Sequence, residues 1–541
     1  MRRFEIPNFA GGLQTETSLA FHRENELSEL VNARIDLALG AITEVPGYAQ
    51  LGNTIANAEI VGLTEYAKSD GTKIRVTACN GDLYTLNGST WSAETQTVST
   101  SVQSDFTVAN DKLMWVNGVN APRSYTGSTW LTTTSQNSDL FHAPQGHLIE
   151  SYKGRVHIAN KTNSRVYRSS QPQEILGVVV GDHNNTVNIA LEDTRYCYAS
   201  MVVDIYAPGE NTTQADSKTI SSVNQSKNTL VMAAAVTLSD GAEIKLEDQT
   251  GSLHVFWGDK DDDYLEIDPS DGENIAAMIS GQDILHIWKD HSYHQWNGNQ
   301  RKRVAEQGAS SQKAVAVYND LDFWFNQEGI QAWPGQRVQK VSNVIKPEIG
   351  QITAANLINV GFGLEEDHLY ASIGDLTSIS NAVLDYDINS NIYQIWEPPD
   401  EFVIFSKYTT GNKRKVIAGT KTGKIMELNS GSTFAGSVIH TKAETREQFI
   451  TLPEEIKEIR QIFVFAKEWT GATAYMRVDG GGKIPLKGLD GGSDLTGIIT
   501  EFKAAEGELK GHYFQLGFLS SGKSVEIDSA VFYYTVQQAV R

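Results

Sequence analysis

Four aspartates form the densest group of residues in this chain that could bind a metal ion. They are Asp259, Asp261, Asp262 and Asp263. Alternate aspartates offer carboxylate oxygens, which are the ligands that calcium prefers. An EF-hand loop also needs glycine at its sixth position and glutamate at its twelfth, whereas Tyr264 and Ser270 stand there in this chain. We therefore expect these aspartates to lie in a solvated turn.

Three histidines, His286, His291 and His294, also lie close together. Strand alternation would place His286 on the same face as Trp288. Zinc sites need ligands that converge from fixed spacings, usually with cysteine, aspartate or glutamate. The sequence contains no His-Glu-x-x-His motif, and neither of its cysteines is near. We therefore expect structural or surface histidines rather than a zinc site.

The glycine run Gly480-Gly481-Gly482-Lys483 is similar to a phosphate-binding loop in composition only. Ile484 follows where serine or threonine must bind magnesium, and Arg477 occupies the position of the required earlier glycine. The sequence also lacks a Gly-x-Ser-x-Gly nucleophile elbow and the Ser-x-Asp-x-Gly boxes of sialidase-type propellers. We expect a hairpin turn here, and for the whole chain no catalytic residue, no cofactor-binding residue and no metal site. The protein is thus predicted not to be an enzyme.

The composition is that of an acidic globular protein. The chain has 541 residues, of which 40% are hydrophobic, and its formal net charge is −21. Because nucleic-acid clamps are basic, the chain is not expected to grip DNA, although an acidic wall could line a passage for it. Cys79 and Cys197 are expected to be buried free thiols. No run of 18 apolar residues and no secretory signal is present, so we expect synthesis in the cytoplasm and no stable membrane insertion.

A repeated four-residue word indicates how these residues are positioned. Gly-Ser-Thr-Trp occurs at Gly88–Trp91 and again at Gly127–Trp130, 39 residues later, and Gly431-Ser432-Thr433-Phe434 is a near copy. Short strand-like segments precede each copy, with tight-turn signals such as Asn80-Gly81 between them. A recurrence near 40 residues among short strands is the spacing of four-stranded propeller blades.

The pattern predicts an all-β fold with a β-propeller of about seven blades. The expected blades are 55–94, 95–138, 139–170 with a continuation near 255–268, 274–304, 308–342, 357–397 and 400–434. The alternative at this point is a large β-sandwich with evenly spaced turns. Tryptophans recur at corresponding points of the blades; packing between blades explains them more simply than the stacking of carbohydrate. They include Trp91, Trp115, Trp130, Trp288, Trp296, Trp324, Trp333 and Trp396.

Interruptions of the repeat predict the domains. Residues 1–54 are expected to be an extended segment with a short helix at Asn25–Ile35, followed by the first part of the propeller at 55–170. Five short strands at 171–254 predict a small β-barrel, inserted before the second part of the propeller at 255–434. Residues 435–541 are expected to form a β-sandwich, with Thr451 capping a single helical turn.

The first 50 residues resemble the opening of a family of tailed-bacteriophage tail proteins. The residues that carry the resemblance are Phe9–Leu13, Asn25–Leu27, Leu30–Asp36, Gly40 and Pro46–Tyr48. The family is the propeller-bearing one related to podophage nozzle, or tail tubular B, proteins. The chain departs from the usual pattern at Gln14, where asparagine is more common, and at Val45, where arginine commonly precedes the proline. Weaker similarity at 271–289 and in the closing strands extends the resemblance over most of the chain.

The resemblance implies a structural role in the virion. Such proteins assemble as a ring, commonly a homohexamer, below the adaptor protein at the distal end of a short tail. They continue the channel for DNA ejection and help to close it until host contact, without binding a DNA sequence. The inserted barrel would then be a place for contacts with neighbouring copies or tail fibres.

Two other functions remain open at the level of the sequence. One is a host-glycan-binding or glycan-cleaving propeller, which predicts an exposed group of aromatic and carboxylate side chains on one propeller face. The other is a minor tail or baseplate hub protein of a longer-tailed phage.

Overall fold

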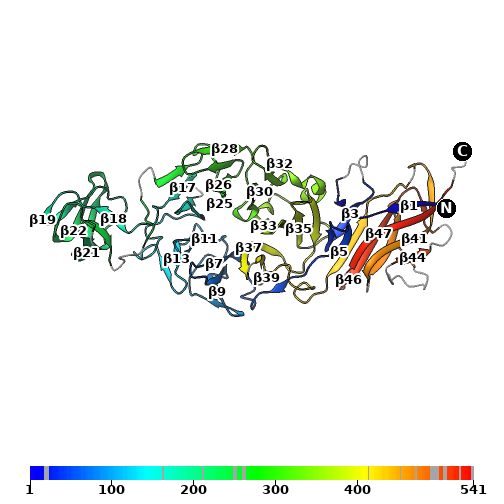
Figure 1. Ribbon diagram of the computed structural model, residues 1–541, viewed down its shortest axis with the longest axis horizontal. Helices are drawn as coiled ribbons and strands as arrows, with labels where there is room; N and C mark the ends of the chain where they lie inside the picture. Colours follow the sequence, from blue (N-terminus) through cyan, green and yellow to red (C-terminus); the bar gives the residue numbers. More distant parts are fainter. Residues whose placement is uncertain are drawn as a thin grey trace. The chain divides into compact units, whose positions relative to one another are not determined.

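The structure is a computed structural model of the full chain, and almost all of its regular elements are β-strands (Figure 1). It describes residues 1–16, 23–160, 164–209, 212–247, 253–258, 263–411, 413–450, 452–469, 472–487, 499–503, 508–522 and 525–537. The chain divides into two compact units. One comprises Met1–Ile60, Asn87–Trp91 and Lys313–Arg541, and the other comprises Val61–Leu86 and Ser92–Gln312. No helix in the described part of the chain is long and apolar enough to cross a membrane.

Four antiparallel four-stranded sheets form the first four blades, and the second unit holds nearly all of their residues. Blade 1 consists of β7 (Ile60–Ala67), β8 (Lys73–Cys79), β9 (Asp82–Asn87) and β10 (Thr90–Ala93). Blade 2 consists of β11 (Asp105–Ala109), β12 (Lys112–Val116), β13 (Arg123–Tyr125) and β14 (Trp130–Thr132). Blade 3 consists of β15 (Leu148–Tyr152), β16 (Arg155–Asn160), β17 (Arg165–Arg168) and β24 (Tyr264–Glu266). Blade 4 consists of β25 (Ile275–Gly281), β26 (Ile284–Lys289), β27 (Tyr293–Trp296) and β28 (Arg301–Ala305).

Three further blades belong to the first unit: blades 5 and 7 are separate four-stranded sheets, and blade 6 is part of a ten-stranded sheet. Blade 5 consists of β29 (Val315–Tyr318), β30 (Leu321–Asn326), β31 (Gly329–Trp333) and β32 (Gln339–Lys340). Blade 6 consists of β33 (Gly361–Glu365), β34 (His368–Gly374), β35 (Ala382–Asp387) and β36 (Ile392–Trp396). Blade 7 consists of β37 (Phe402–Thr410), β38 (Lys413–Thr420), β39 (Ile425–Glu427) and, from the N-terminal segment, β6 (Ala49–Gln50). The predicted fold, a β-propeller of about seven blades, is confirmed.

The fourth strand of blade 7 differs from the sequence-based expectation. Residues 400–434 were expected to complete this blade alone, but Gln50 and Ala49 of β6 pair with Met426 and Glu427 of β39. The sheet therefore combines three strands from the end of the propeller sequence with one strand that precedes its first blade. Such a pairing has no local signature, because its partners are far apart in the chain.

A six-stranded barrel is inserted between β17 and β24 of blade 3. Its strands are β18 (Ile175–Val178), β19 (His183–Ala190), β20 (Val202–Tyr206), β21 (Thr213–Asn224), β22 (Thr229–Leu238) and β23 (Glu243–Leu246). They pair in the order β18-β23-β20-β21-β22-β19, and a bridge between Val179 and Leu191 joins the last strand to the first. A small barrel was predicted, and the strand that the prediction missed is β18.

Two sheets form the C-terminal sandwich, and both include N-terminal strands. The first sheet contains β4 (Ala33–Asp36), β5 (Ala41–Glu44), β47 (Val525–Gln537), β41 (Ile456–Trp469) and β44 (Ile499–Lys503), with β1 (Arg2–Ile6) and β45 (Lys510–Gly511) at its sides. The second contains β3 (Glu26–Val31), β40 (His440–Thr445), β46 (Phe514–Ser521), β42 (Ala472–Val478) and β43 (Ile484–Pro485), with β2 (Gly12–Leu13) beside β3. Phe9, Leu27, Leu30, Phe518 and Phe532 lie in the shared core.

The prediction of a helix at Asn25–Ile35 is wrong. These residues form β3 and β4, separated by Asn32 with a left-handed φ of 52°. Leu27, Leu30 and Val31 have helical spacing, but they are buried in the sandwich core. The spacing misled because β3 buries apolar side chains on both faces, Leu30 on one and Leu27 and Val31 on the other, so its apolar residues do not alternate. Residues 1–54 are thus part of the sandwich and of blade 7 rather than a separate segment.

The single helical turn expected near Thr451 is also absent from the described residues. Thr451 itself lies outside them, and Leu452 to Glu455 form a turn with one Glu455 N–H to Leu452 carbonyl bond of 3.1 Å before β41 begins at Ile456. The other predicted domain boundaries stay predictions.

Candidate functional site

The residues that carry the phage-tail resemblance lie where the sandwich joins blades 6 and 7, all within the first unit. Val31 of β3 pairs in parallel with Ile395 of β36, so blade 6 and one sandwich sheet form a single ten-stranded sheet. Asn32 then donates from its side chain to the His440 carbonyl at 2.9 Å and accepts from the Glu397 amide at 2.7 Å. The side-chain amide of Asn32 thus connects Glu397, which follows β36, to His440 at the start of β40.

Arg34 forms the central ion pair of this junction. Its Nε and Nη2 donate to Oδ2 of the fully buried Asp385 at 3.2 and 2.9 Å. His368 Nδ1 lies 2.6 Å from Oδ1 of the same carboxylate, and Gln394 donates to Oδ2 at 2.6 Å. The Arg34 guanidinium also lies over the ring of Trp396, 5.5 Å from its centroid. One side chain of β4 therefore contacts three strands of blade 6.

The electrostatics of this network stabilise its charged forms. Burial favours a neutral Asp385, but Arg34 and His368 outweigh burial and hold the pKa of Asp385 below its usual value. Burial likewise favours neutral forms of Arg34 and His368, but Asp385 outweighs it and raises the pKa of each. The second ring nitrogen of His368 lies 3.8 Å from Asp367. Both nitrogens of this histidine thus face carboxylates rather than a nucleophile, which is the arrangement of a structural ion pair.

Pro46-Gly47-Tyr48 joins the N-terminal segment to the end of blade 7. Tyr48 stacks on Phe434 with ring centroids 4.9 Å apart, and its hydroxyl donates to Asp400 at 3.2 Å. A Cβ at Gly47 would lie 2.1 Å from the Thr433 carbonyl oxygen, so glycine is required there. The third copy of the repeated word, which includes Thr433 and Phe434, is therefore the surface against which this motif packs.

The other two copies of the word occupy equivalent turns. Gly88–Trp91 connects β9 to β10, and Gly127–Trp130 connects β13 to β14. Trp91 is buried, and its Nε1 donates to the Leu51 carbonyl at 2.9 Å. Trp130 stacks on Tyr125 with ring centroids 4.7 Å apart. The word thus marks the turn before the outermost strand of a blade.

The tryptophans pack inside the protein. Of the eight that recur in the blades, only Trp130 is not buried. Trp115, Trp288 and Trp324 occupy the second strands of blades 2, 4 and 5 and are completely inaccessible to solvent. These rings are therefore used in packing, and the exposed aromatic platform that carbohydrate stacking needs is not formed by them.

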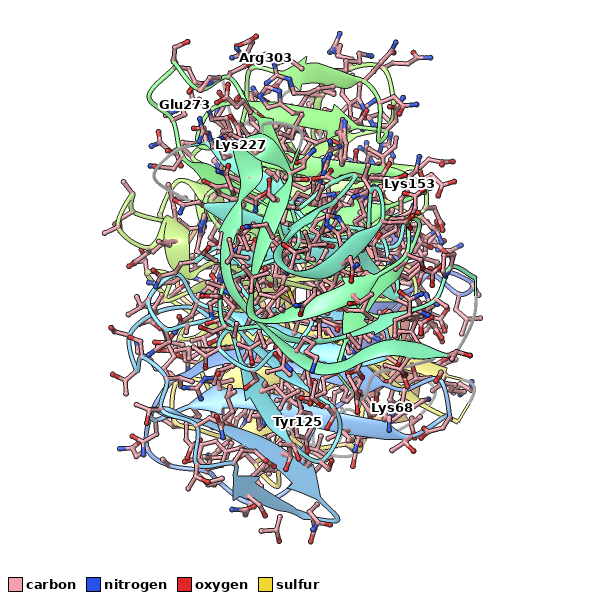
Figure 2. All side chains as sticks on the ribbon, turned by 90° about the vertical axis from the view of Figure 1, so that its left-hand side faces the viewer. Lys68, Tyr125, Lys153, Lys227, Glu273 and Arg303 are labelled. Carbon is pink, nitrogen blue, oxygen red and sulfur yellow. The ribbon has the colours of Figure 1, made fainter. Side chains whose placement is uncertain are left out.

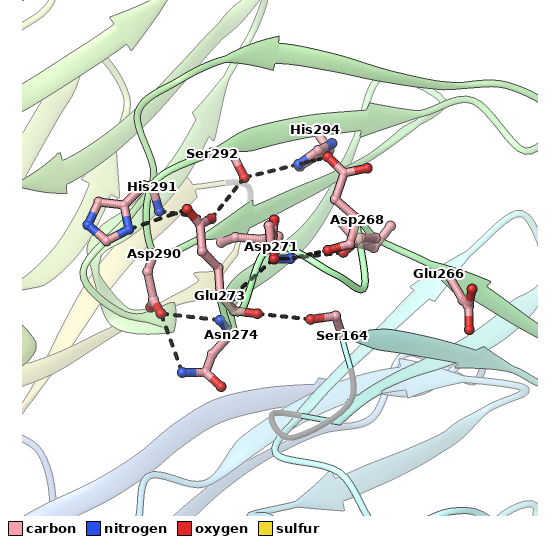
Figure 3. Close-up of polar contacts among 12 residues, drawn as sticks. Ser164, Glu266, Asp268, Asp271, Glu273, Asn274, Asp290, His291, Ser292 and His294 are labelled. Atoms are coloured by element: carbon pink, nitrogen blue, oxygen red, sulfur yellow. Dashed lines mark hydrogen bonds and ion pairs between the residues drawn. The ribbon is translucent and has the colours of Figure 1, made fainter.

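The three candidate histidines do not converge on one site, and Figure 3 shows two of them, His291 and His294, pointing to different partners. His286 stacks on Trp288, as strand alternation predicts, and its Nδ1 lies 2.6 Å from the Tyr293 hydroxyl. His294 pairs in register with Ile287, so its side chain lies on the other face of the sheet from that of His286. Burial lowers the pKa of His294 to about 4. His291 is exposed and lies 3.4 Å from Glu273.

A buried lysine holds the loop between β24 and β25 beside these histidines (Figure 3). Lys289 Nζ donates to the Ile267 and Asp268 carbonyls at 2.9 and 3.1 Å and to Asp271 at 2.5 Å. Burial opposes ionisation of Asp271, but Lys289 outweighs it and lowers the pKa of Asp271. Asp268 pairs with Arg301 at 2.8 Å. Asp268 and Asp271 are thus each paired with a basic side chain, and these pairs fix the loop.

Of the aspartates expected in a solvated turn, Asp263 departs from the expectation because it is buried. Asp259, Asp261 and Asp262 lie outside the described residues, whereas Asp263 is buried with its carboxylate 3.7 Å from Arg195. Gly480 continues a turn whose Asp479 accepts the His512 and Tyr513 amides at 2.8 and 3.0 Å. Lys483 lies over the Tyr475 ring, 4.5 Å from its centroid. Within the described ranges no group of three or more His, Cys, Asp or Glu is placed to hold a metal ion.

The inserted barrel is fixed to the blades by a loop that sequence reasoning did not single out. Gln136, in the loop after β14, donates to the Val202 carbonyl of β20 at 3.4 Å and accepts its amide at 3.1 Å. His142 stacks on Tyr198 with ring centroids 3.8 Å apart. The buried Asp139 pairs with Lys112 at 2.9 Å and with His254 at 3.0 Å. These contacts hold the barrel to blade 2, in addition to the two segments of chain that connect the barrel to blade 3.

Tyrosine hydroxyls join consecutive blades of the second unit. Tyr66 of blade 1 donates to the Asp111 carbonyl of blade 2 at 2.6 Å, and Tyr152 of blade 3 donates to the Asp283 carbonyl of blade 4 at 2.6 Å. The acceptor turns both contain two residues of positive φ. The lysine after Tyr152, Lys153, donates to the Asn297 carbonyl of blade 4 at 2.7 Å (Figure 2).

Comparison with known proteins gives no family and only distant structural similarity. No protein-family model matches the chain, and no curated protein matches it. Two solved structures are similar in fold, one titled "YCF48 bound to D1 peptide" and the other YCF48 from Cyanidioschyzon merolae. The first has 10% identity and a TM-score of 0.37, and covers 71% of this chain and 97% of its own. The second has 8% identity and a TM-score of 0.36, and covers 71% of this chain and 98% of its own.

Proposed function

We propose that this chain is a structural subunit of a bacteriophage tail, which assembles as a hexameric ring and extends the channel through which DNA is ejected. The observation that carries the proposal is the use of the N-terminal motif. Asn32, Gly47 and Tyr48, which belong to the pattern that resembles nozzle proteins, and Arg34, which lies within it, all make contacts that join the sandwich to blades 6 and 7. We therefore interpret the motif as residues that hold two parts of the fold together rather than as a binding site.

The chemistry of the described residues supports a role without catalysis. The Asp385–His368 pair is enclosed by Arg34 and Asp367, and the Lys289 cluster is internally neutralised. The net charge of −21 is suited to a passage along which DNA must move without adhering. We propose that the tail adaptor protein and tail fibres are the stable partners of the ring, and that DNA is a transient one.

Sedimentation of the purified chain tests the assembly. A monomer of 59.5 kDa would form a ring six times heavier, and the proposal expects this species to persist at micromolar concentration. A strictly monomeric protein would contradict it.

The glycan-directed alternative is tested with the same preparation. Incubation with host surface polysaccharide should give neither saturable binding nor release of reducing ends. Turnover or tight binding by a monomer would favour a host-recognition propeller instead.

A further inference from the structure

A cavity of about 410 Å³ lies where blade 6 meets the sandwich sheet, in the first unit. Its floor is formed by the faces of β3, β40, β46 and β42, and its side by the segment after β34 and by Glu397, which follows β36. The volume falls within the range of sites that bind small ligands, which is roughly 300 to 1,000 Å³. Neither the N-terminal motif nor the proposed channel accounts for it.

The lining combines an apolar floor with polar walls. Val31, Ile379 and Leu519 are the apolar residues, and Ser378, Thr473 and Ser521 contribute hydroxyl groups. The lining includes the imidazole of His440 but no Phe, Tyr or Trp side chain, so the cavity lacks the broad platform on which a sugar ring stacks. The lining fits a ligand that has an aliphatic stem and a polar end with several hydrogen-bond donors.

The charges of the cavity favour a cation at that polar end. Glu29 and Lys442 form an ion pair across β3 and β40, which neutralises both. Glu397 accepts the Ser380 amide at 3.2 Å, and the described residues place no basic side chain within ion-pair distance of it. Its carboxylate is exposed and adds an uncompensated negative charge to the cavity wall.

We propose that this cavity binds an arginine side chain presented by a segment of a partner protein. A guanidinium offers five N–H donors in a planar fork that matches a carboxylate, and the hydroxyl of Ser521, on the same face of β46 as Leu519, accepts a further donor. The aliphatic stem lies along Val31 and Leu519. Because the chain carries a net charge of −21, a basic partner is also attracted to it over a distance. The site is a docking point for a protein, and it does not depend on the tail assignment.

Calorimetric titration of the full-length chain with a blocked Gly-Gly-Arg-Gly-Gly peptide tests the proposal, with the citrulline peptide as the matched uncharged probe. We expect millimolar binding of the arginine peptide at low salt, at least fivefold weaker binding of the citrulline peptide, and weakening by added salt. Glu397→Gln should reduce arginine binding at least fivefold. Glu401→Gln, which removes a nearby carboxylate that pairs with Lys421, should leave it unchanged.

Equal binding of the two peptides, or unaltered binding to Glu397→Gln, would overturn the proposal. If Glu397→Gln fails to fold, Ser378→Trp fills the cavity from an exposed segment and should abolish binding by itself. Sedimentation tests whether the cavity is instead occupied by a second copy of this chain. Self-association that is lost in Glu397→Gln, without any peptide binding, would assign the cavity to a second copy of this chain and contradict a separate partner.

Discussion

At the scale of single residues, the buried Arg34–Asp385 pair shows what the N-terminal motif does. Asp385 has no solvent exposure, and its charge is matched by Arg34 together with His368. Removing one partner of a buried pair leaves an uncompensated charge, whereas replacing both by apolar residues is often tolerated. The motif arginine is thus required by the carboxylate that it faces.

A double-mutant cycle tests this interpretation. Arg34→Met alone should lower the free energy of unfolding of the first unit by about 3–5 kcal/mol, because Asp385 stays buried without its main cation. Arg34→Met combined with Asp385→Leu should recover a substantial part of that loss. Chemical denaturation followed by tryptophan fluorescence measures both, since Trp396 lies beside Arg34. Additive losses would show that the two side chains do not interact.

The glycine of Pro46-Gly47-Tyr48 allows a second residue-scale prediction. Gly47→Ala places a Cβ 2.1 Å from the Thr433 carbonyl oxygen, so the backbone must move, and we expect a loss of about 1–3 kcal/mol. Gly482→Ala is the matched control, because a Cβ there meets no atom within 4 Å. Thermal unfolding of the two variants, compared with the wild type, measures the difference. Equal midpoints for both variants would rule out the close approach at Gly47.

Two carboxyl groups on neighbouring blades predict a pH dependence of stability. Burial raises the pKa of Asp105 to about 7 and that of Glu150 to about 8. Asp105 accepts the Ile149 amide at 2.8 Å and Glu150 accepts the Ser280 hydroxyl at 2.6 Å, while the described residues provide neither with an ion pair. The folded state therefore binds protons more tightly than the unfolded chain, in which such groups titrate near pH 4.

The sign of the effect follows from these raised pKa values. Stability contributed by the two neutral carboxyls is complete below about pH 4 and is lost as the pH rises through about 7 and 8. The thermal midpoint should fall between pH 5 and 9, and Asp105→Asn or Glu150→Gln should make that fall shallower. Glu266→Gln, which removes an exposed partner of Arg165, is the control and should keep the wild-type slope. Parallel slopes for all four proteins would contradict the prediction.

At the scale of elements, tyrosine hydroxyls connect one blade to the next. Tyr66 and Tyr152 each donate to a carbonyl in the first hairpin turn of the following blade at 2.6 Å. These turns need positive φ at two successive positions, which Asn110-Asp111 and Gln282-Asp283 adopt. A side chain of one blade thus holds the turn of its neighbour.

Removing either hydroxyl should loosen the turn that accepts it. Tyr66→Phe and Tyr152→Phe should each cost about 1 kcal/mol, since the turn carbonyl loses its hydrogen-bond donor. Hydrogen exchange followed by mass spectrometry should speed up in the turn at 110–111 or 282–283, respectively, and not elsewhere. Tyr533→Phe is the control, because its hydroxyl has no hydrogen bond among the described residues. Unchanged exchange in both turns would remove this role for the tyrosines.

Element by element, local patterns in the sequence predicted the strands well and their distant partners poorly. The Asn80-Gly81 hairpin was expected because it accepts positive φ, and both residues have it. By contrast, β6 pairs with β39 across the whole propeller sequence, and β3 was mistaken for a helix because both of its faces are covered. The contacts of Arg34 with Asp385 were likewise not predictable, since no spacing rule joins residues that far apart.

At the scale of the whole molecule, the account joins a propeller, an inserted barrel and a sandwich that shares a sheet with blade 6. Gln136 and His142 fix the barrel to blade 2, so we propose that the barrel is a rigid arm for contacts with neighbouring copies or tail fibres. We propose that the chain is a structural building block of the tail.

Electron microscopy of the purified full-length protein tests the central claim most directly. The account predicts class averages of closed rings with six equivalent subunits around an open or plugged central channel. Particles that are uniformly single copies, at concentrations where phage tail rings would remain assembled, would contradict it.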